Sequence, residues 1–167
     1  MWALDFRFDH TSDARVLKYL SITDEFSKEA LGIEVERSLS GEDIVTILEA
    51  LINVHEAPGF VRMGNGTKMT SNTVADWCRF STANISFKDL GSSWQNAYVE
   101  SFNGKLRDVL LGIDILTTLL EIKIMAEDYR QDYNQNRPHS SLGYKTPNEF
   151  KQNWQHNNQG LTTVLAY

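Results

Sequence analysis

The sequence predicts an α/β fold in which a five-stranded mixed sheet is flanked by helices. Residues 2–9 alternate apolar and charged side chains, and two further segments, 15–23 and 29–36, have the composition of strands. Shorter strand-like segments at 59–63 and 84–88 each follow a helical pattern. The first three segments favour an antiparallel meander, whereas strands joined through helices are typically parallel. The sheet is therefore expected to contain both kinds of pairing.

The first strand is expected to have one apolar and one charged face. Successive side chains of a strand point to opposite sides, so the sequence WALDFRFD separates into two sets. The apolar set is Trp2, Leu4, Phe6 and Phe8, and the other set is Ala3, Asp5, Arg7 and Asp9. An acid, Asp5, is thereby placed in the middle of the charged face.

Helices are expected where apolar residues recur every three or four positions. Ser40, followed by Glu42 and Asp43, predicts a capped helix that runs to about His55. The apolar faces of the next two helices contain Val74, Trp77 and Cys78, and then Phe102, Leu106, Val109 and Leu110. A last long helix is predicted from about Asp114 to Asn134, because Pro138 stops it. Its inward residues are expected to be Leu119, Ile122, Ala126, Tyr129 and Tyr133.

Length and composition fit one domain of a globular protein, with 167 residues of which 41% are hydrophobic and 23% charged. We divide it into a core (1–112), a helical extension of the same domain (113–150) and a tail without clear periodicity (151–167). No stretch has the 18 or so apolar residues of a membrane helix, and charges near the N-terminus argue against a signal peptide. A soluble, cytoplasmic protein without a membrane partner is expected. The single cysteine, Cys78, excludes an internal disulfide and is expected to be buried.

The formal net charge of −6 argues against a strongly basic nucleic-acid binder, but the charge is unevenly spread. Residues 1–60 carry a net charge of −7 and residues 61–167 a net charge of +1. A polyanion would therefore meet the second part more easily. Any DNA binding is expected to be weak, salt-sensitive and non-specific.

Two acids are candidates for a metal site. Phosphoryl transfer on nucleic acids commonly uses metal ions held by carboxylates that several elements bring to one place. Asp5 lies on the charged face of the first strand, and Glu100 lies near the start of a helix on the side opposite its apolar stripe. By pattern alone, the more usual explanation is that both are solvated or salt-bridged surface acids.

Five sequence blocks carry a resemblance to a known family. They are WALDF (2–6), ITDEFSKEAL (22–31), GNGTKMTS (64–71), WQNAYVESFNGKLRD (94–108) and YNQNRPHSSLGYKTP (133–147). From Trp2 to Phe150 the chain resembles the catalytic core of bacterial insertion-sequence transposases. These are DDE recombinases related to retroviral integrases, with a ribonuclease H-like fold. The resemblance implies DNA cleavage and strand transfer, that is, DNA integration and transposition.

The resemblance also implies which residues form the site. The family's first Asp matches Asp5, and the Glu that opens a helix matches Glu100. Its second Asp begins a turn after the fourth strand, thirty-five residues before the Glu, and this position is Gly64. The turn residues Asn65 and Gly66 are kept, but the acid is replaced by a residue without a side chain. The residues at 67–69 and the loop LGSSW also depart from the family pattern.

A vacant second position implies weakened metal binding. Magnesium or manganese is expected as a single weak ion held by Asp5 and Glu100, completed by waters and substrate phosphate. Asn65 is a weaker ligand, and Asp9 lies roughly 13 Å along the strand at about 3.3 Å per residue, so neither replaces the missing acid. We therefore expect the activity to be lost or nearly lost, either in a decayed mobile-element copy or by deliberate inactivation.

Polar residues around Glu100 are candidates for DNA contact. Asn96, Asn103 and Arg107 share its helix face and Lys105 lies nearby, which suits phosphate oxygens; the alternative is an ordinary solvated face. Farther along, Arg137 and His139 flank Pro138 and are expected to hold the chain where the last helix ends.

The expected partners are DNA and a second copy of the chain, since the related enzymes act as multimers. A full-length transposase is a further candidate partner. The relatives carry DNA-recognising helix-turn-helix segments upstream, so we expect no sequence-specific recognition from this chain. Two rival functions stay open: a non-catalytic nucleic-acid-binding or transposase-interacting module, and a nuclease of the same fold.

Overall fold

The computed structural model describes most of the chain, and its side chains with a few exceptions. The described residues are 1–10, 14–63, 68–80, 84–87, 97–111 and 118–164. Within these ranges, side chains are described except at 68–71, 84–87, 97–100, 109–111 and 159–164. Gly64, Asn65, Gly66 and Asn96 lie outside the described residues.

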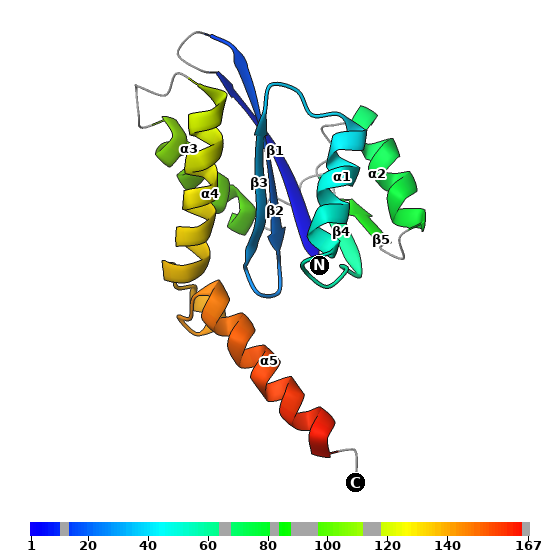
Figure 1. The fold of residues 1–167 in the computed structure, drawn as a ribbon, viewed down its shortest axis with the longest axis vertical. Helices are drawn as coiled ribbons and strands as arrows, with labels where there is room; N and C mark the ends of the chain where they lie inside the picture. Colours follow the sequence, from blue (N-terminus) through cyan, green and yellow to red (C-terminus); the bar gives the residue numbers. More distant parts are fainter. Residues whose placement is uncertain (11–13, 64–67, 81–83, 88–96, 112–117, 165–167) are drawn as a thin grey trace.

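A five-stranded mixed sheet forms the centre of the molecule (Figure 1). The strands are β1 (Trp2–His10), β2 (Val16–Asp24), β3 (Ala30–Glu36), β4 (Phe60–Met63) and β5 (Asn84–Phe87), in the order β3-β2-β1-β4-β5. The first three strands pair antiparallel, whereas β4 pairs parallel with β1, and β5 pairs parallel with β4. The fold class and the mixed pairing expected from the sequence are confirmed.

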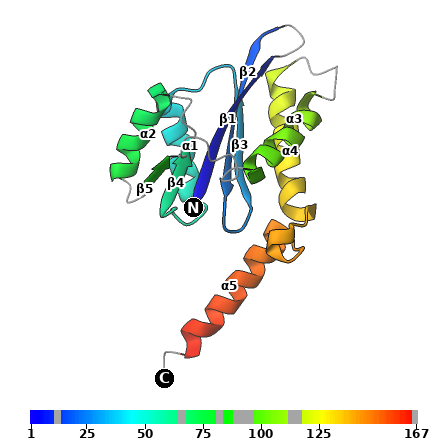
Figure 2. The ribbon, with the colours of Figure 1, turned by 180° about the vertical axis from the view of Figure 1, so that it is seen from behind.

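Helices cover both faces of the sheet (Figures 1 and 2). One face carries α1 (Gly41–Ile52) and α2 (Lys68–Phe80), and the other carries α3 (Ala97–Leu111) and α4 (Leu119–Asn136). A short 3-10 turn, η2 (Ser140–Leu142), leads into α5 (Pro147–Val164), which projects away from the body. None of the helices in the described part of the chain is long and apolar enough to cross a membrane.

Two hydrophobic cores lie on the two sides of the sheet because strand side chains alternate between its faces. The core toward α1 and α2 contains Leu4, Leu20, Ile22, Leu48 and Val61 among its buried members. The core toward α3 and α4 contains Leu17, Tyr19, Val35, Phe102, Ile122, Ala126 and Tyr133. The inward residues predicted for the last helix are therefore confirmed, and Cys78 is buried as expected.

The predicted cap of the first helix is present as a reciprocal pair of hydrogen bonds. The Asp43 backbone N–H donates to Ser40 Oγ at 3.2 Å, and the Ser40 backbone N–H donates to an Asp43 carboxylate oxygen at 2.8 Å. These bonds satisfy two donors that a helix start otherwise leaves without partners, which sets the start of α1 at Gly41.

The structure corrects three expectations. Phe8, expected on the apolar face, is 59% exposed because the β1–β2 hairpin extends past α1. Its ring instead has the Lys18 ammonium nitrogen 5.8 Å from the ring centre. The last long helix ends at Asn136, and Thr118 caps its start, later than the predicted Asp114. The stretch expected to be a tail is mostly helical, because α5 extends to Val164. The division of the chain at residues 112 and 150 stays a prediction.

Candidate active site

The predicted acid Asp5 lies where α3 crosses the first strand. Its side chain is 17% exposed and is held by two donors. The Asn103 amide Nδ2 donates to Asp5 Oδ2 at 2.6 Å, and the Arg7 guanidinium Nε donates to the same oxygen at 3.1 Å. Asn103 comes from α3, 98 residues away in the sequence, so this contact depends on the tertiary fold.

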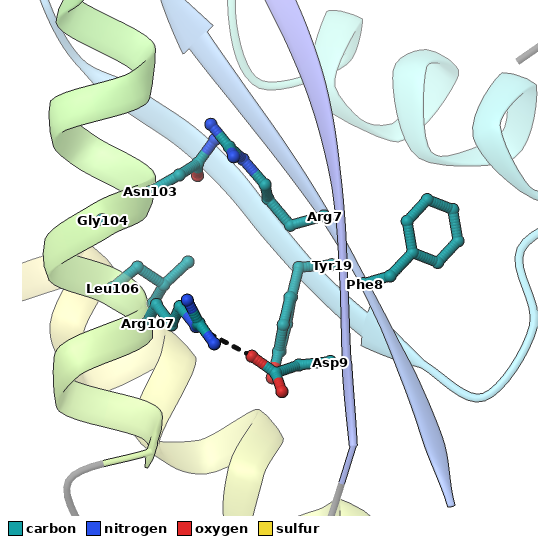
Figure 3. A pocket seen from close by; sticks show the side chains of 8 residues that line it. All are labelled: Arg7, Phe8, Asp9, Tyr19, Asn103, Gly104, Leu106 and Arg107. Atoms are coloured by element: carbon teal, nitrogen blue, oxygen red, sulfur yellow. Dashed lines mark hydrogen bonds and ion pairs between the residues drawn. The ribbon is translucent and has the colours of Figure 1, made fainter. Parts of the chain in front are cut away.

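A second contact fixes the direction of α3 along β1. Arg107 Nε donates to Asp9 Oδ2 at 3.0 Å, four residues after the first contact on both elements (Figure 3). The helix and the strand therefore run in the same direction. Glu100 precedes Asn103 by three residues, which is about one helical turn, so its backbone is in the turn next to the Asp5 contact. The side chain of Glu100 lies outside what the structure describes.

Gly64, the vacant position of the second acid, follows directly after β4 in the sequence. Met63, the last residue of that strand, is the parallel partner of Leu4, which precedes Asp5. The register thus brings the end of β4 beside the strand that carries Asp5. Gly64 itself is outside the described residues, so its relation to Asp5 stays a prediction.

A cavity of about 260 Å³ follows the Asp5 contact along the seam between β1 and α3 (Figure 3). Charged groups from both elements line it, namely Arg7, Asp9 and Arg107, together with Tyr19, Asn103 and Gly104. The Tyr19 hydroxyl is buried without a hydrogen-bond partner among the described residues. The pKa of Tyr19 is raised to about 12, chiefly because burial disfavours the phenolate; the Asp9 carboxylate acts in the same direction and Arg107 opposes it.

The predicted DNA-contact residues differ in their surroundings. Lys105 is exposed and Arg107 has a 67% exposed side chain, so both face solvent. Asn103 is only 5% exposed, and its amide is bound to Asp5 rather than presented to solvent. Asn96 lies outside the described residues. Asp9, too far along the strand to replace the missing acid, accepts from Arg107 and from the His10 backbone N–H.

Three residues of the site were not singled out from the sequence. Arg7 binds Asp5, Tyr19 contributes a buried hydroxyl, and the buried Ser21 Oγ also has no partner among the described residues. Ser21 pairs with Asp5 across β1 and β2, and Tyr19 pairs with Arg7. The position of Arg7 two residues after Asp5 was a usable signal, because such residues share a strand face. Ser21 and Tyr19 could not be found in the same way, because their place beside Asp5 and Arg7 depends on the register between β1 and β2.

Arg137 and His139 lie at the connection between α4 and α5, in contacts that suit a structural role. The His139 backbone N–H donates to the Lys145 carbonyl at 3.0 Å, and the Arg137 guanidinium lies 5.4 Å from the ring centre of Tyr133. The pKa of His139 is lowered by burial first and then by the nearby cations of Arg137, Lys28 and Lys105.

Within the described residues, no group of three His, Cys, Asp or Glu side chains is arranged to hold a metal ion.

Known proteins with similar sequences come from bacterial insertion elements. Residues 81–147 match the family described as "Integrase core domain". The chain is 37% identical over 150 residues to an uncharacterized 31.7 kDa protein of insertion element IS407 from Burkholderia multivorans, covering 90% of this chain and 54% of that protein. It is also 37% identical over 153 residues to an uncharacterized 39.2 kDa protein of IS476 from Xanthomonas euvesicatoria, covering 92% of this chain and 44% of that protein. The chain thus spans about half the length of the curated relatives it matches.

The fold is shared with retroviral integrases at low sequence identity. The catalytic core domain of HTLV-2 integrase, solved in complex with magnesium in a trimeric form, superposes with a TM-score of 0.68 and 18% identity, covering 89% of this chain and 93% of that one. Residues 81–147 thus match the integrase core domain family, and the chain as a whole is similar to insertion-element proteins and has the ribonuclease H-like fold of integrase catalytic cores.

Proposed function

We propose that this chain is the catalytic core of an insertion-element transposase, built to cleave DNA and transfer the cut strand, and that its own activity is impaired at Gly64. The observation that carries the proposal is the hydrogen bond from Asn103 to Asp5. This bond holds α3 against the first strand one helical turn from Glu100, which supports a site shared by the two acids. The relationship to insertion-element proteins supports DNA as the substrate.

We infer a divalent cation, Mg²⁺ or Mn²⁺, as the cofactor, with Asp5 and Glu100 as its protein ligands. Asp5 Oδ1 accepts no hydrogen bond from the described residues, and the Ser21 hydroxyl across the sheet is buried without a partner. A buried hydroxyl without a partner, beside a carboxylate that keeps one oxygen open, fits a site that is completed by an ion and its waters. Mg²⁺ is commonly bound by one or two carboxylates plus substrate phosphates. When bound, such an ion activates the attacking oxygen and stabilises the leaving oxygen.

The remaining residues of the site position the acid and the DNA. Asn103 orients the Asp5 carboxylate through a bond to Oδ2 and leaves Oδ1 open. Lys105 and Arg107 on the exposed side of α3 supply positive charge for phosphate oxygens, and Asn96 stays a candidate from the sequence for the same role. Contacts of this type fix the register of the DNA without reading its sequence.

Impairment follows from the missing ligand at Gly64. Glycine offers no donor atom, so one ion of a metal pair would depend on Asp5, water and phosphate alone. Losing a residue that only supports a ligand commonly costs about 10- to 100-fold in metal affinity or activity, and losing the ligand itself costs more. We therefore expect the unmodified chain to be close to inactive.

Restoring the acid tests the proposal. We expect Gly64→Asp to raise Mg²⁺- or Mn²⁺-dependent nicking of plasmid DNA and joining of oligonucleotide ends by about 10- to 100-fold or more over the unmodified chain. The Gly64→Asn variant is the matched control, because it adds a side chain of the same size without the charge. A second control, Asp5→Asn in the Gly64→Asp background, is expected to return activity to background.

The outcomes separate the parts of the proposal. Robust strand transfer by the unmodified chain would show that Gly64 does not impair it. An inactive but folded Gly64→Asp variant would contradict the assignment as a catalytic core. Cleavage without joining would favour a nuclease of the same fold.

The vacant position also favours a second candidate, a non-catalytic subunit that pairs with an intact transposase or with a second copy as a dimer. The HTLV-2 core was solved as a trimer, and comparable self-association is proposed for this chain. The test mixes tagged and untagged copies, one of them Gly64→Asp. Co-purification of mixed oligomers with lowered activity per Gly64→Asp subunit would support this candidate, and separate purification of the two would exclude it.

A further inference from the structure

Arg7 makes an ion pair with the acid to which the proposed function assigns a metal ion. Its Nε donates to Asp5 Oδ2 at 3.1 Å, while its side chain is 49% exposed. The two outer nitrogens, Nη1 and Nη2, have no hydrogen-bond partner among the described residues and lie at the cavity between β1 and α3 (Figure 3). Arg7 is therefore attached to its neighbour through one nitrogen and is free to move toward solvent.

The position of Arg7 makes it a competitor for any cation at Asp5. Asp5 Oδ2 already accepts from Asn103 and Arg7, and the arginine charge is within ion-pair distance of the carboxylate. A divalent ion bound to the same carboxylate would lie within a few ångströms of a guanidinium that stays charged at all relevant pH values. Asn103 is neutral and buried, so it can keep its bond while the cation is exchanged.

We propose that Arg7 is a built-in counter-cation of Asp5, which neutralises the carboxylate in the metal-free protein and competes with a divalent ion for it. The inference rests on the proposed metal site and adds a residue that sets its affinity. Arg7 is a positioning residue and not a ligand. A half-exposed ion pair is weak, so it lowers the affinity for the metal ion modestly and does not prevent binding.

Removing the arginine charge tests the proposal by direct metal binding. We expect Arg7→Gln to bind Mn²⁺ about two- to fivefold more tightly than the parent chain, measured by the EPR signal of free Mn²⁺ during titration. Arg7→Lys, which keeps the charge, is expected to stay within about twofold of the parent. The exposed position of Arg7 means that neither variant should unfold the chain.

Two controls isolate the effect. Arg79→Gln makes the same chemical change in an exposed ion pair on α2, where Arg79 Nη1 lies 2.8 Å from Asp76, and should leave Mn²⁺ affinity unchanged. Asp5→Asn should weaken Mn²⁺ binding, and adding Arg7→Gln to it should give no gain. As an independent readout, the Arg7 Nε–H resonance in ¹⁵N-correlated NMR spectra should shift when Mg²⁺ is added.

Each outcome bears on a separate claim. Unchanged or weaker Mn²⁺ binding by Arg7→Gln, with Asp5→Asn still weakening it, would overturn the role of Arg7 alone. Equal binding by the parent and Asp5→Asn would overturn both this inference and the proposed metal site. A gain shared by Arg7→Gln and Arg79→Gln would show a general charge effect and would also overturn the inference.

Discussion

At the scale of single residues, the face of β1 toward α3 is a row of charges that are already paired. Asp5 is bonded to Arg7 and Asp9 to Arg107, each through the arginine Nε. The outer edges of both guanidinium groups remain directed toward the cavity and solvent, where a phosphate can be held by two parallel bonds. The charges of this face are thus paired with one another, and the two arginines can still bind an anion. They do so in a chain that is acidic overall.

Tyr19 supplies a prediction at the same scale. Its hydroxyl is buried without a partner among the described residues, so Tyr19→Phe removes no hydrogen bond and should leave the free energy of unfolding unchanged or raise it by up to about 1 kcal/mol. Tyr129→Phe is the matched control, since the Tyr129 hydroxyl donates to the Phe102 carbonyl at 3.4 Å, and it should cost about 1 kcal/mol. Urea unfolding at neutral pH measures both. An equal loss in the two variants would contradict the prediction.

The raised pKa of Tyr19 adds a test in alkaline solution. A folded-state pKa of about 12 lies above the ordinary value of 10. The neutral phenol of Tyr19 therefore adds to the free energy of unfolding in full below pH 10, and this stabilisation is lost as the pH rises toward 12. Melting temperatures between pH 8 and 11.5 should therefore fall less steeply in Tyr19→Phe than in the parent chain. Parallel curves would show that the phenol ionises equally easily in both states.

At the scale of elements, close packing of α1 on α2 depends on a glycine. A Cβ atom added at Gly41, the first residue of α1, would lie 2.7 Å from the Cβ and Oγ1 atoms of Thr73. Real side chains do not approach this closely, so the two helices would have to separate. Gly104 in the middle of α3 is the opposite case, because a Cβ there would meet no atom of the described residues within 4 Å.

The two glycines predict opposite effects of one substitution. Gly41→Ala should destabilise the protein by about 1–3 kcal/mol through overpacking. Gly104→Ala should stabilise it by about 0.5–1 kcal/mol, because alanine has the better helix propensity and nothing obstructs it. Thermal and urea unfolding of the two variants give the comparison. Stabilisation by Gly41→Ala would mean that α2 can move away from α1 at little cost.

At the scale of the whole molecule, α5 is attached to the body mainly through its first two turns (Figures 1 and 2). The ring of Phe26 lies 5.3 Å from that of Phe150 and 4.8 Å from that of Trp154. Lys151 Nζ donates to Glu29 at 2.7 Å and contacts His55 Nδ1 at 3.3 Å. Because a lysine ammonium only donates, this contact requires a neutral His55.

The attachment of α5 is therefore expected to weaken in acid. The pKa of His55 is lowered, first by burial and then by Lys151 and Arg130, with Glu29 and Asp24 acting in the opposite direction. Because the folded-state pKa is lowered, neutral His55 stabilises the attachment of α5 in full above the ordinary pKa near 6.5. This stabilisation is lost as the pH falls below that value. Hydrogen exchange of α5 amides, corrected for intrinsic rates, should accelerate relative to α4 between pH 7.5 and pH 5.

The His55→Gln variant is the control for that measurement. Glutamine can accept from Lys151 at both pH values, so the difference between pH 7.5 and pH 5 should disappear. A persistent acid-induced opening in His55→Gln would assign the effect to the carboxylates of Glu29 or Asp24 instead.

Much of this architecture could be predicted before any tertiary contact was known. The period of two in residues 2–9, the capping pair of Ser40 and Asp43, and the apolar spacing from Leu119 to Tyr133 all reappear in the structure. Each of these features is local, because a strand or helix converts spacing along the chain directly into a face. The stretch after Pro147 was harder to predict, since the first half of this helix offers Phe150 and Trp154 among polar residues, and the Phe26 ring that they pack against is distant in sequence.

By itself, the sequence determined the strands, the caps, the family resemblance and the spacing of Asp5, Gly64 and Glu100 along the chain. Only the tertiary structure decided that Asn103 and Arg7 share one oxygen of Asp5, that the Tyr19 hydroxyl has no partner within the described part of the chain, and that Phe8 is exposed. The physical reason is distance along the chain. Periodicity specifies the direction in which a side chain points, whereas the partner it meets 98 residues away depends on how a whole helix packs across a whole sheet.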